Sequence, residues 1–178
     1  LNNKKKRQKG IGIKVYDKEF IIKIAEETGL SQEYIENNEQ KRDALAALNS
    51  GYYSGINNSD ELFIKESEMI KDVAQKESCV IVGRCADFIL REKADCLRVF
   101  IHASMEYRSD RIVREHGERE ESPAQRLKDK DKRRASYYQF YTDMKWGYAP
   151  NYHLSLDSGE IGIEKCADII INLYQSKK

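Results

Sequence analysis

The stretch Cys79-Val80-Ile81-Val82-Gly83-Arg84 decides the fold class that the sequence predicts. Its short apolar run, without a polar break, is typical of a strand buried on both faces in a parallel sheet. Gly83 lets the backbone turn, so we expect Arg84 just past the carboxyl end of this strand, where open α/β sheets bind their ligands. Its planar guanidinium group suits a phosphate or a carboxylate. The alternative is that Arg84 pairs with a structural Asp or Glu.

Strand-like and helix-like segments alternate along the rest of the chain. We expect strands at residues 11–17, 79–82, 97–103 and 152–156. This alternation predicts an α/β fold, with a parallel sheet and crossover helices on both of its faces. The length fits one domain over residues 1–178. The expected helices are a long one capped by Asp60, a short one at 86–90, one capped by Ser104, one that starts at Ser122-Pro123, and one at 161–174.

The overall charge is balanced, with 31 Lys and Arg against 30 Asp and Glu and a net charge of +1. This balance argues against a general nucleic-acid-binding surface. No apolar run approaches the roughly 20 residues of a membrane span, and no secretory signal is visible. The cysteine spacings fit no zinc pattern, so we expect no metal site and reduced thiols in a cytoplasmic protein. The four cysteines are Cys79, Cys85, Cys96 and Cys166.

The most strongly basic region runs from Arg108 to Arg134, with ten Lys or Arg and seven acidic residues. One interpretation is a solvated pair of helices with i to i+4 ion pairs. The other is a mobile, Arg-rich cover over a phosphate site, in which guanidinium groups stabilise the charge of a transferring phosphoryl group. Asp131 and Arg134 share a helix face three residues apart. They could hold a base edge and a phosphate together, or pair with each other.

An ordered series of segments resembles the cytidylate-kinase-like family of P-loop nucleoside monophosphate kinases. The resemblance extends from about Lys14 to Ile171. The segments are Cys79-Val-Ile-Val-Gly-Arg-Cys-Ala-Asp, Leu97-Arg-Val-Phe-Ile-His-Ala-Ser, Glu106-Tyr-Arg, Asp131-Lys-Arg-Arg-Ala-Ser-Tyr-Tyr, Lys145-Trp-Gly and Tyr152-His-Leu-Ser-Leu-Asp.

The resemblance implies a P-loop kinase-like fold with a five-stranded parallel sheet. It also implies a monophosphate-binding lobe at residues 18–59 and a lid at 115–128. The implied reaction transfers the γ-phosphoryl group of ATP, with Mg²⁺, to CMP or a related nucleoside monophosphate. ATP and the nucleoside monophosphate would then be the small-molecule partners, with no nucleic acid and no membrane involved.

The resemblance also implies roles for particular residues. Lys23, Arg84, Asp131 and Arg134 would bind the acceptor nucleotide. Arg108, Arg111 and Lys128 would act on the transferring group. Two positions depart from the family pattern: Cys85 stands where true cytidylate kinases have Asp after Gly-Arg, and Lys23 stands for an Arg. A point charge there replaces a planar fork, so recognition of the acceptor could differ.

The sequence contains no Gly-x-x-x-x-Gly-Lys-Ser/Thr phosphate loop. Either the loop and first strand belong to a segment missing from this sequence, or the protein has lost them. The intact set of Arg residues favours the missing segment. Two rivals to the kinase hypothesis stay open: a nucleotide-binding regulatory module with a degenerate donor site, and a kinase-like scaffold whose Arg-rich region binds an acidic partner.

Overall fold

The structure, a computed structural model, describes residues 12–17, 58–93 and 95–177. The chain divides into two compact units, Leu1–Lys93 and Ala94–Lys178, and each is described by itself. Lys23 and nearly all of the lobe expected at 18–59 lie outside the described residues. The described elements, in chain order, are β1 (Lys14–Tyr16), α4 (Asn58–Lys76), β2 (Cys79–Ile81), α5 (Ala86–Ile89), β3 (Val99–His102), α6 (Met105–His116), α7 (Pro123–Thr142), the 3-10 turn η1 (Ala149–Asn151), β4 (Leu154–Asp157) and α8 (Ile163–Ser176).

In the first unit, β1 and β2 pair in parallel, with Val15 opposite Val80. Parallel strands need a crossover, and the described part of this crossover is α4. One stripe of α4 is buried, and its positions recur at the three- and four-residue spacing of an amphipathic helix. The buried apolar members of the stripe are Leu62, Met69, Ile70 and Val73, and the same stripe contains Glu66.

The expectation that 79–82 is buried on both faces is wrong for two of its side chains. Val80 is 44% exposed and Val82 is 50% exposed. Within the described residues β2 has a single neighbouring strand, β1. A strand with one partner lacks the cover that a central strand receives, which explains this exposure.

The turn after β2 is left-handed over three consecutive residues. The φ angles of Gly83, Arg84 and Cys85 are +76°, +59° and +53°. Glycine adopts such angles without strain, whereas each of the two following residues costs about 1–2 kcal/mol there. The turn is closed by the amide of Ala86, which donates to the Gly83 carbonyl over 3.0 Å. Surrounding contacts must therefore hold Arg84 and Cys85 in place.

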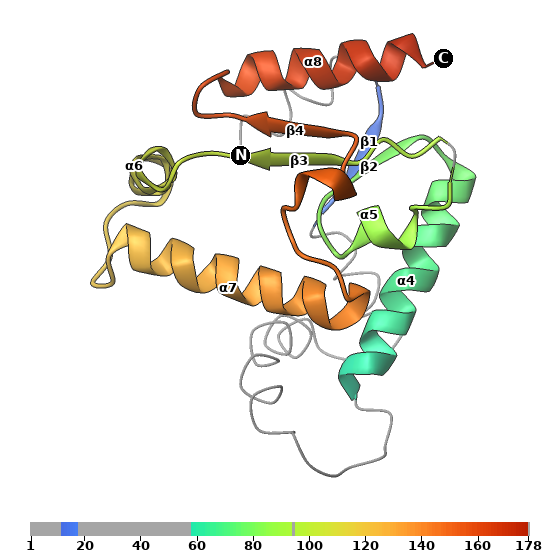
Figure 1. The fold of residues 1–178 in the computed structure, drawn as a ribbon, viewed down its shortest axis with the longest axis horizontal. Helices are drawn as coiled ribbons and strands as arrows, with labels where there is room; N and C mark the ends of the chain where they lie inside the picture. The colour runs from blue at the N-terminus through green and yellow to red at the C-terminus, as the bar shows by residue number, and fades with distance from the viewer. Residues whose placement is uncertain (1–11, 18–57, 94, 178) are drawn as a thin grey trace. The chain divides into compact units, whose positions relative to one another are not determined.

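In the second unit, β3 and β4 also pair in parallel, with Phe100 opposite Ser155 and His102 opposite Asp157. Figure 1 shows α6 end-on beyond β3, α7 running back from it, and α8 running opposite to β4. Helix α6 contacts α7. Ser104 and Ser122 cap these two helices, because each Oγ accepts a 3.2 Å hydrogen bond from the amide three residues later. Such caps contribute about 1 kcal/mol each.

Several expected boundaries are confirmed and others are corrected. The helices that start after Ser104 and at Ser122-Pro123 and the short helix after Arg84 are present. Asp60 does not cap α4, which begins at Asn58, so Asp60 lies in its first turn. The last strand begins at Leu154, because the chain before it makes the 3-10 turn. Pairing is parallel as expected, but the described strands form two two-stranded sheets instead of one five-stranded sheet.

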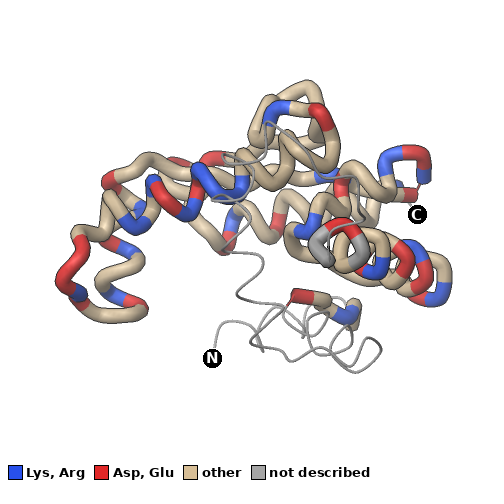
Figure 2. Tube along the Cα trace, turned by 90° about the horizontal axis from the view of Figure 1, so that it is seen from below, with Lys and Arg blue, Asp and Glu red and all other residues tan. Residues whose placement is uncertain are grey.

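The surface charges are mixed in sign, as Figure 2 shows along the described helices. No described helix has the length and apolar character needed to cross a bilayer. The four cysteines, all within the described residues, form no disulfide bond.

Candidate functional site

A pocket of about 330 Å³ opens in the second unit where β3 and β4 end. Its walls come from the end of β3, the first half of α6, one position on α7, the loop after α7 and the turn after β4. Carboxyl ends of parallel strands are the usual ligand-binding edge of an α/β sheet. The volume falls at the small end of the range for ligand pockets. The lining residues are Phe100, Ile101, His102, Ala103, Tyr107, Arg108, Arg111, Asp131, Trp146 and Ser158.

The carboxylate of Asp131 bridges two guanidinium groups. Its Oδ2 accepts a 2.7 Å hydrogen bond from Nη1 of Arg108, and its Oδ1 accepts a 3.1 Å hydrogen bond from Nη1 of Arg134. Arg108 and Asp131 are partly buried, while the side chain of Arg134 is 56% exposed. The structure thus brings together three residues predicted for the site, and Asp131 and Arg134 do pair with each other. The bridge fixes the position of Arg108 at the pocket wall.

Arg108 has unused hydrogen-bonding capacity. Its Nε is buried and has no hydrogen-bond partner among the described residues. A buried donor that lacks a partner costs about 1–3 kcal/mol. Because Arg108 also lines the pocket, its guanidinium group combines a fixed position with an unsatisfied donor.

Arg111, one turn further along α6, also lines the pocket and pairs with Glu115 over 2.9 Å. The hydrogen bond from Arg111 lowers the pKa of Glu115 below its ordinary value. Both side chains are more than one-third exposed, so solvent weakens this pair. An anion in the pocket could therefore compete with Glu115 for Arg111 at little cost.

The turn after β4 is organised by Asp157. Its Oδ1 accepts hydrogen bonds from the amides of Gly159, at 2.8 Å, and Glu160, at 3.3 Å. Its Oδ2 lies 3.7 Å from Nδ1 of His102. The hydroxyl of Ser158 donates to the His102 carbonyl. These contacts make Asp157 the residue that organises the turn, and they hold the pocket edge between β3 and β4.

The other predicted site residues do not line this pocket. Lys128 is an exposed residue of α7. Arg84 belongs to the first unit, where its Nη1 donates a 2.8 Å hydrogen bond to Oε1 of Glu66. Arg84 therefore does pair with an acidic residue, which is the alternative given for it in the sequence analysis. Lys23 lies outside the described residues.

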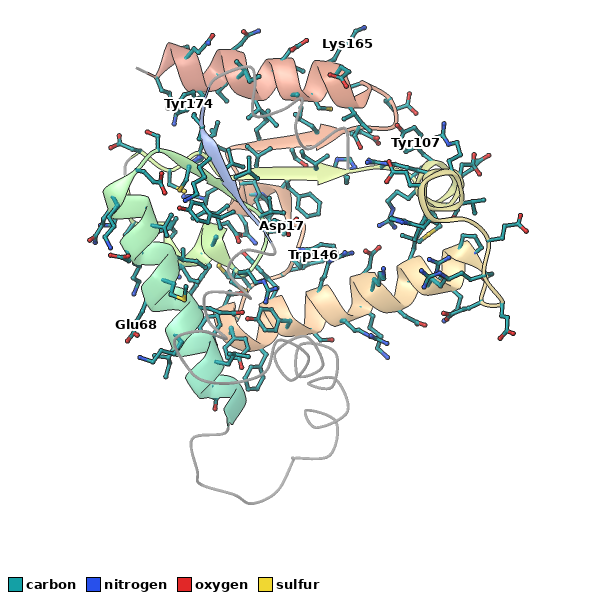
Figure 3. The ribbon with its side chains drawn as sticks, turned by 180° about the vertical axis from the view of Figure 1, so that it is seen from behind. Asp17, Glu68, Tyr107, Trp146, Lys165 and Tyr174 are labelled. Carbon is teal, nitrogen blue, oxygen red and sulfur yellow. The ribbon has the colours of Figure 1, made fainter. Side chains whose placement is uncertain are left out.

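Sequence reasoning missed the aromatic side of the pocket. Figure 3 shows Trp146 between the β3–β4 pair and α7, and Tyr107 on α6. The ring of Phe100 packs edge-on against the indole of Trp146, with ring centres 5.4 Å apart. The only signal in the sequence is the Lys145-Trp-Gly segment, one of the segments that carry the family resemblance. An aromatic side chain in a loop does not reveal which cavity it borders.

Within the described ranges, no group of three or more His, Cys, Asp or Glu side chains could hold a metal ion. This result matches the chemistry of the pocket, whose charged lining is two Arg and one Asp. Mg²⁺ is usually bound by one or two carboxylates together with substrate phosphates. Any Mg²⁺ at this pocket would therefore depend on phosphate oxygens for most of its ligands.

A sequence model of the cytidylate kinase-like family matches residues 8–160, which is most of the chain. The chain belongs to the cytidylate kinase-like family. This membership confirms the resemblance read from the ordered segments. It indicates a kinase-like protein and leaves the acceptor open. No curated protein matches the chain.

A solved structure with a similar fold is an uncharacterized protein from Eubacterium ventriosum ATCC 27560. It shares 25% sequence identity with the chain, with a TM-score of 0.73. The match covers 97% of this chain and 89% of that one. The similarity therefore concerns the fold over nearly the full length of both proteins.

Proposed function

We propose that the protein is a phosphotransferase that moves the γ-phosphoryl group of ATP to CMP or a related nucleoside monophosphate. One observation carries the proposal: two guanidinium groups, of Arg108 and Arg111, line a pocket at the strand ends in a cytidylate kinase-like chain. Phosphoryl transfer requires mainly positioning and neutralisation of spreading negative charge, with little covalent chemistry by the protein. Fixed guanidinium groups supply both.

We assign different roles to the pocket side chains according to their positions. Arg108 and Arg111 would neutralise charge on the phosphates. Lys128 is proposed for the same role on the basis of the family pattern, although it does not line the pocket. Asp131 holds Arg108 and Arg134 through its two oxygens, so the guanidinium groups are oriented before the ligand arrives. Preorganised charges of this kind are worth more in a partly buried site than in water.

Lys23 and Arg84 are proposed as acceptor-binding residues on the basis of the family pattern. In that role Arg84 would be oriented by Glu66, whose carboxylate is buried at 2% exposure. ATP would bring Mg²⁺, which would supply charge neutralisation at the phosphates. The residues of the chain would bind and orient the two substrates.

The test is a coupled assay of ADP formation over a panel of nucleoside monophosphates. Replacing Arg108 with Met should lower kcat/KM at least about 100-fold, as expected for one preorganised charge at the reacting group. The matched control is Arg114→Met, because Arg114 is an exposed Arg on the same helix and does not line the pocket. ADP formation absent with every nucleoside monophosphate would remove the proposal.

A second candidate is a nucleotide-binding regulatory module without catalysis. It is favoured by one observation, the absence of a Gly-x-x-x-x-Gly-Lys-Ser/Thr loop from the 178 residues. This candidate predicts that CMP raises the melting temperature of the chain while ATP does not. Equal stabilisation by both nucleotides, together with turnover, would favour the kinase.

A further inference from the structure

The loop that carries Trp146 is held firmly against β3. Gly147 lies so close to Phe100 that a Cβ there would be 2.9 Å from Cζ of the ring. The amide of Gly147 donates to the hydroxyl of Tyr152 over 3.3 Å, and the side-chain amide of Asn151 donates to the Lys145 carbonyl over 2.9 Å. The indole therefore borders the pocket from a loop that is already ordered.

The positively charged side chains of the pocket come from α6. The guanidinium groups of Arg108 and Arg111 enter from the helix that follows β3, whereas Trp146 packs on Phe100, near the start of that strand. Phe100 and Ala103 are three residues apart, or roughly 10 Å along a strand. Trp146 and the two guanidinium groups therefore lie toward different ends of the pocket, with Tyr107 also on the α6 side. A nucleotide covers such a span from its base to its phosphates.

We propose that Trp146 is the base-stacking wall of this pocket. The occupant is one nucleoside phosphate, whose base lies against the indole and whose phosphate reaches Arg108 and Arg111. The inference rests on the proposed function and adds to it a binding residue and an orientation for the ligand. A cavity of about 330 Å³ accommodates one nucleotide, so the second substrate of a kinase must bind elsewhere.

Stacking on Trp146 would increase the affinity for a nucleotide without discriminating between bases. Every base presents a flat π-face, and stacking on an aromatic side chain is therefore tolerant of sequence. The guanidinium group of Arg108, at the pocket wall, supplies positive charge for the phosphate. Because the loop is ordered before binding, little conformational entropy is lost when the base arrives.

The protein itself provides the probe, because Trp146 is the single tryptophan of the chain. Its emission should be quenched saturably when the full chain is titrated with CMP or with ATP, and comparison of the two identifies which nucleotide occupies the pocket. Ribose 5-phosphate, which lacks a base, should leave the emission unchanged. Calorimetry with Trp146→Leu should then show a Kd raised about 10-fold, and with Trp146→Phe a smaller increase, because Phe retains a π-face.

The matched control is Tyr148→Leu. Tyr148 is an aromatic residue of the same loop, is 53% exposed and does not line the pocket, so its replacement should leave Kd unchanged. Nucleotide that binds by calorimetry without altering the emission of the unmodified chain would overturn the role of Trp146 and leave the proposed function intact. Absence of binding by any nucleotide would overturn both. The emission test uses the unmodified chain, so it does not depend on whether a variant folds.

Discussion

Arg84 and Glu66 form a buried ion pair in the first unit, with Nη1 and Oε1 2.8 Å apart. Glu66 sits within the apolar stripe of α4 at 2% exposure, and the side chain of Arg84 is 16% exposed. The pair joins the turn after β2 to the helix before it. An Arg at a strand end can therefore have a structural partner even in a chain whose family predicts nucleotide binding by that residue.

Replacing Glu66 with Gln should destabilise the protein by about 3 kcal/mol, because it removes a charged partner from a mostly buried guanidinium group. Chemical denaturation followed by circular dichroism measures this loss. The control is Glu68→Gln on the same helix. Glu68 is exposed and pairs with Lys65 over 3.1 Å at the surface, so its change should stay within about 0.5 kcal/mol. Equal losses in the two variants would contradict the structural role of the pair.

Gly147→Ala should be markedly more destabilising than Gly117→Ala. Both glycines have positive φ, +71° and +73°, so both variants incur backbone strain of about 1–2 kcal/mol. Only at Gly147 does the new methyl group meet a ring, at 2.9 Å from Cζ of Phe100. Overpacking adds about 1–3 kcal/mol. Thermal unfolding compares the variants, and a shift in Trp146 emission for Gly147→Ala alone would locate the disturbance.

His153 should make stability depend on pH. His153 is exposed, and weak desolvation by its neighbours, followed by the charges of Arg98 and Lys177, lowers its pKa below the ordinary value of 6.5. Its Nδ1 also accepts a hydrogen bond from the amide of Arg98 over 3.2 Å, which requires an unprotonated Nδ1.

The folded state therefore binds this proton less readily than the unfolded state, so the contribution of His153 is fully present above pH 6.5 and is lost as the pH falls through the lowered pKa. Urea denaturation between pH 8 and pH 5 should show this decline, reduced in His153→Gln. If stability falls equally with pH in the unmodified protein and in His153→Gln, groups other than His153 cause the decline.

Arg126→Met should stabilise the protein. Arg126 is 8% exposed, and its Nη1 is buried without a hydrogen-bond partner among the described residues. Replacing a poorly compensated buried charge with an apolar side chain of similar length is expected to gain about 1 kcal/mol or more. That gain corresponds to a rise of roughly 2–4 °C in Tm for a chain of this size. Lys130→Met, at an exposed position of the same helix, should change Tm little, and a fall in Tm for Arg126→Met would reveal a stabilising role for the charge.

Local signals in the sequence predicted the helices of the second unit well. Ser104 and the Ser122-Pro123 pair specify helix starts through short-range hydrogen bonds, which need no knowledge of the tertiary structure. Asp60 misled because an acidic residue is favourable both as a cap and in the first turn of a helix. One residue type therefore fits two positions, and α4 begins at Asn58, three residues before the start that a cap at Asp60 implies.

The site was predictable only in part. Asp131 and Arg134 are three residues apart on one helix, so their pairing followed from spacing alone. The contact of Arg108 with Asp131 joins two helices across 23 positions of sequence, and no local pattern encodes it. The same holds for Trp146, whose place at the pocket depends on its packing against Phe100.

The left-handed turn at residues 83–85 has a consequence for sequence variation. Two of its three members are not glycine, so this corner of the backbone tolerates side chains that it does not favour. A saturation library read out by protein abundance should show glycine and asparagine enriched at position 85 relative to other buried positions. At position 84 the same relief of backbone strain is opposed by the loss of a charged partner of the buried Glu66. Arg84 should therefore be retained in that library although its backbone angle favours glycine.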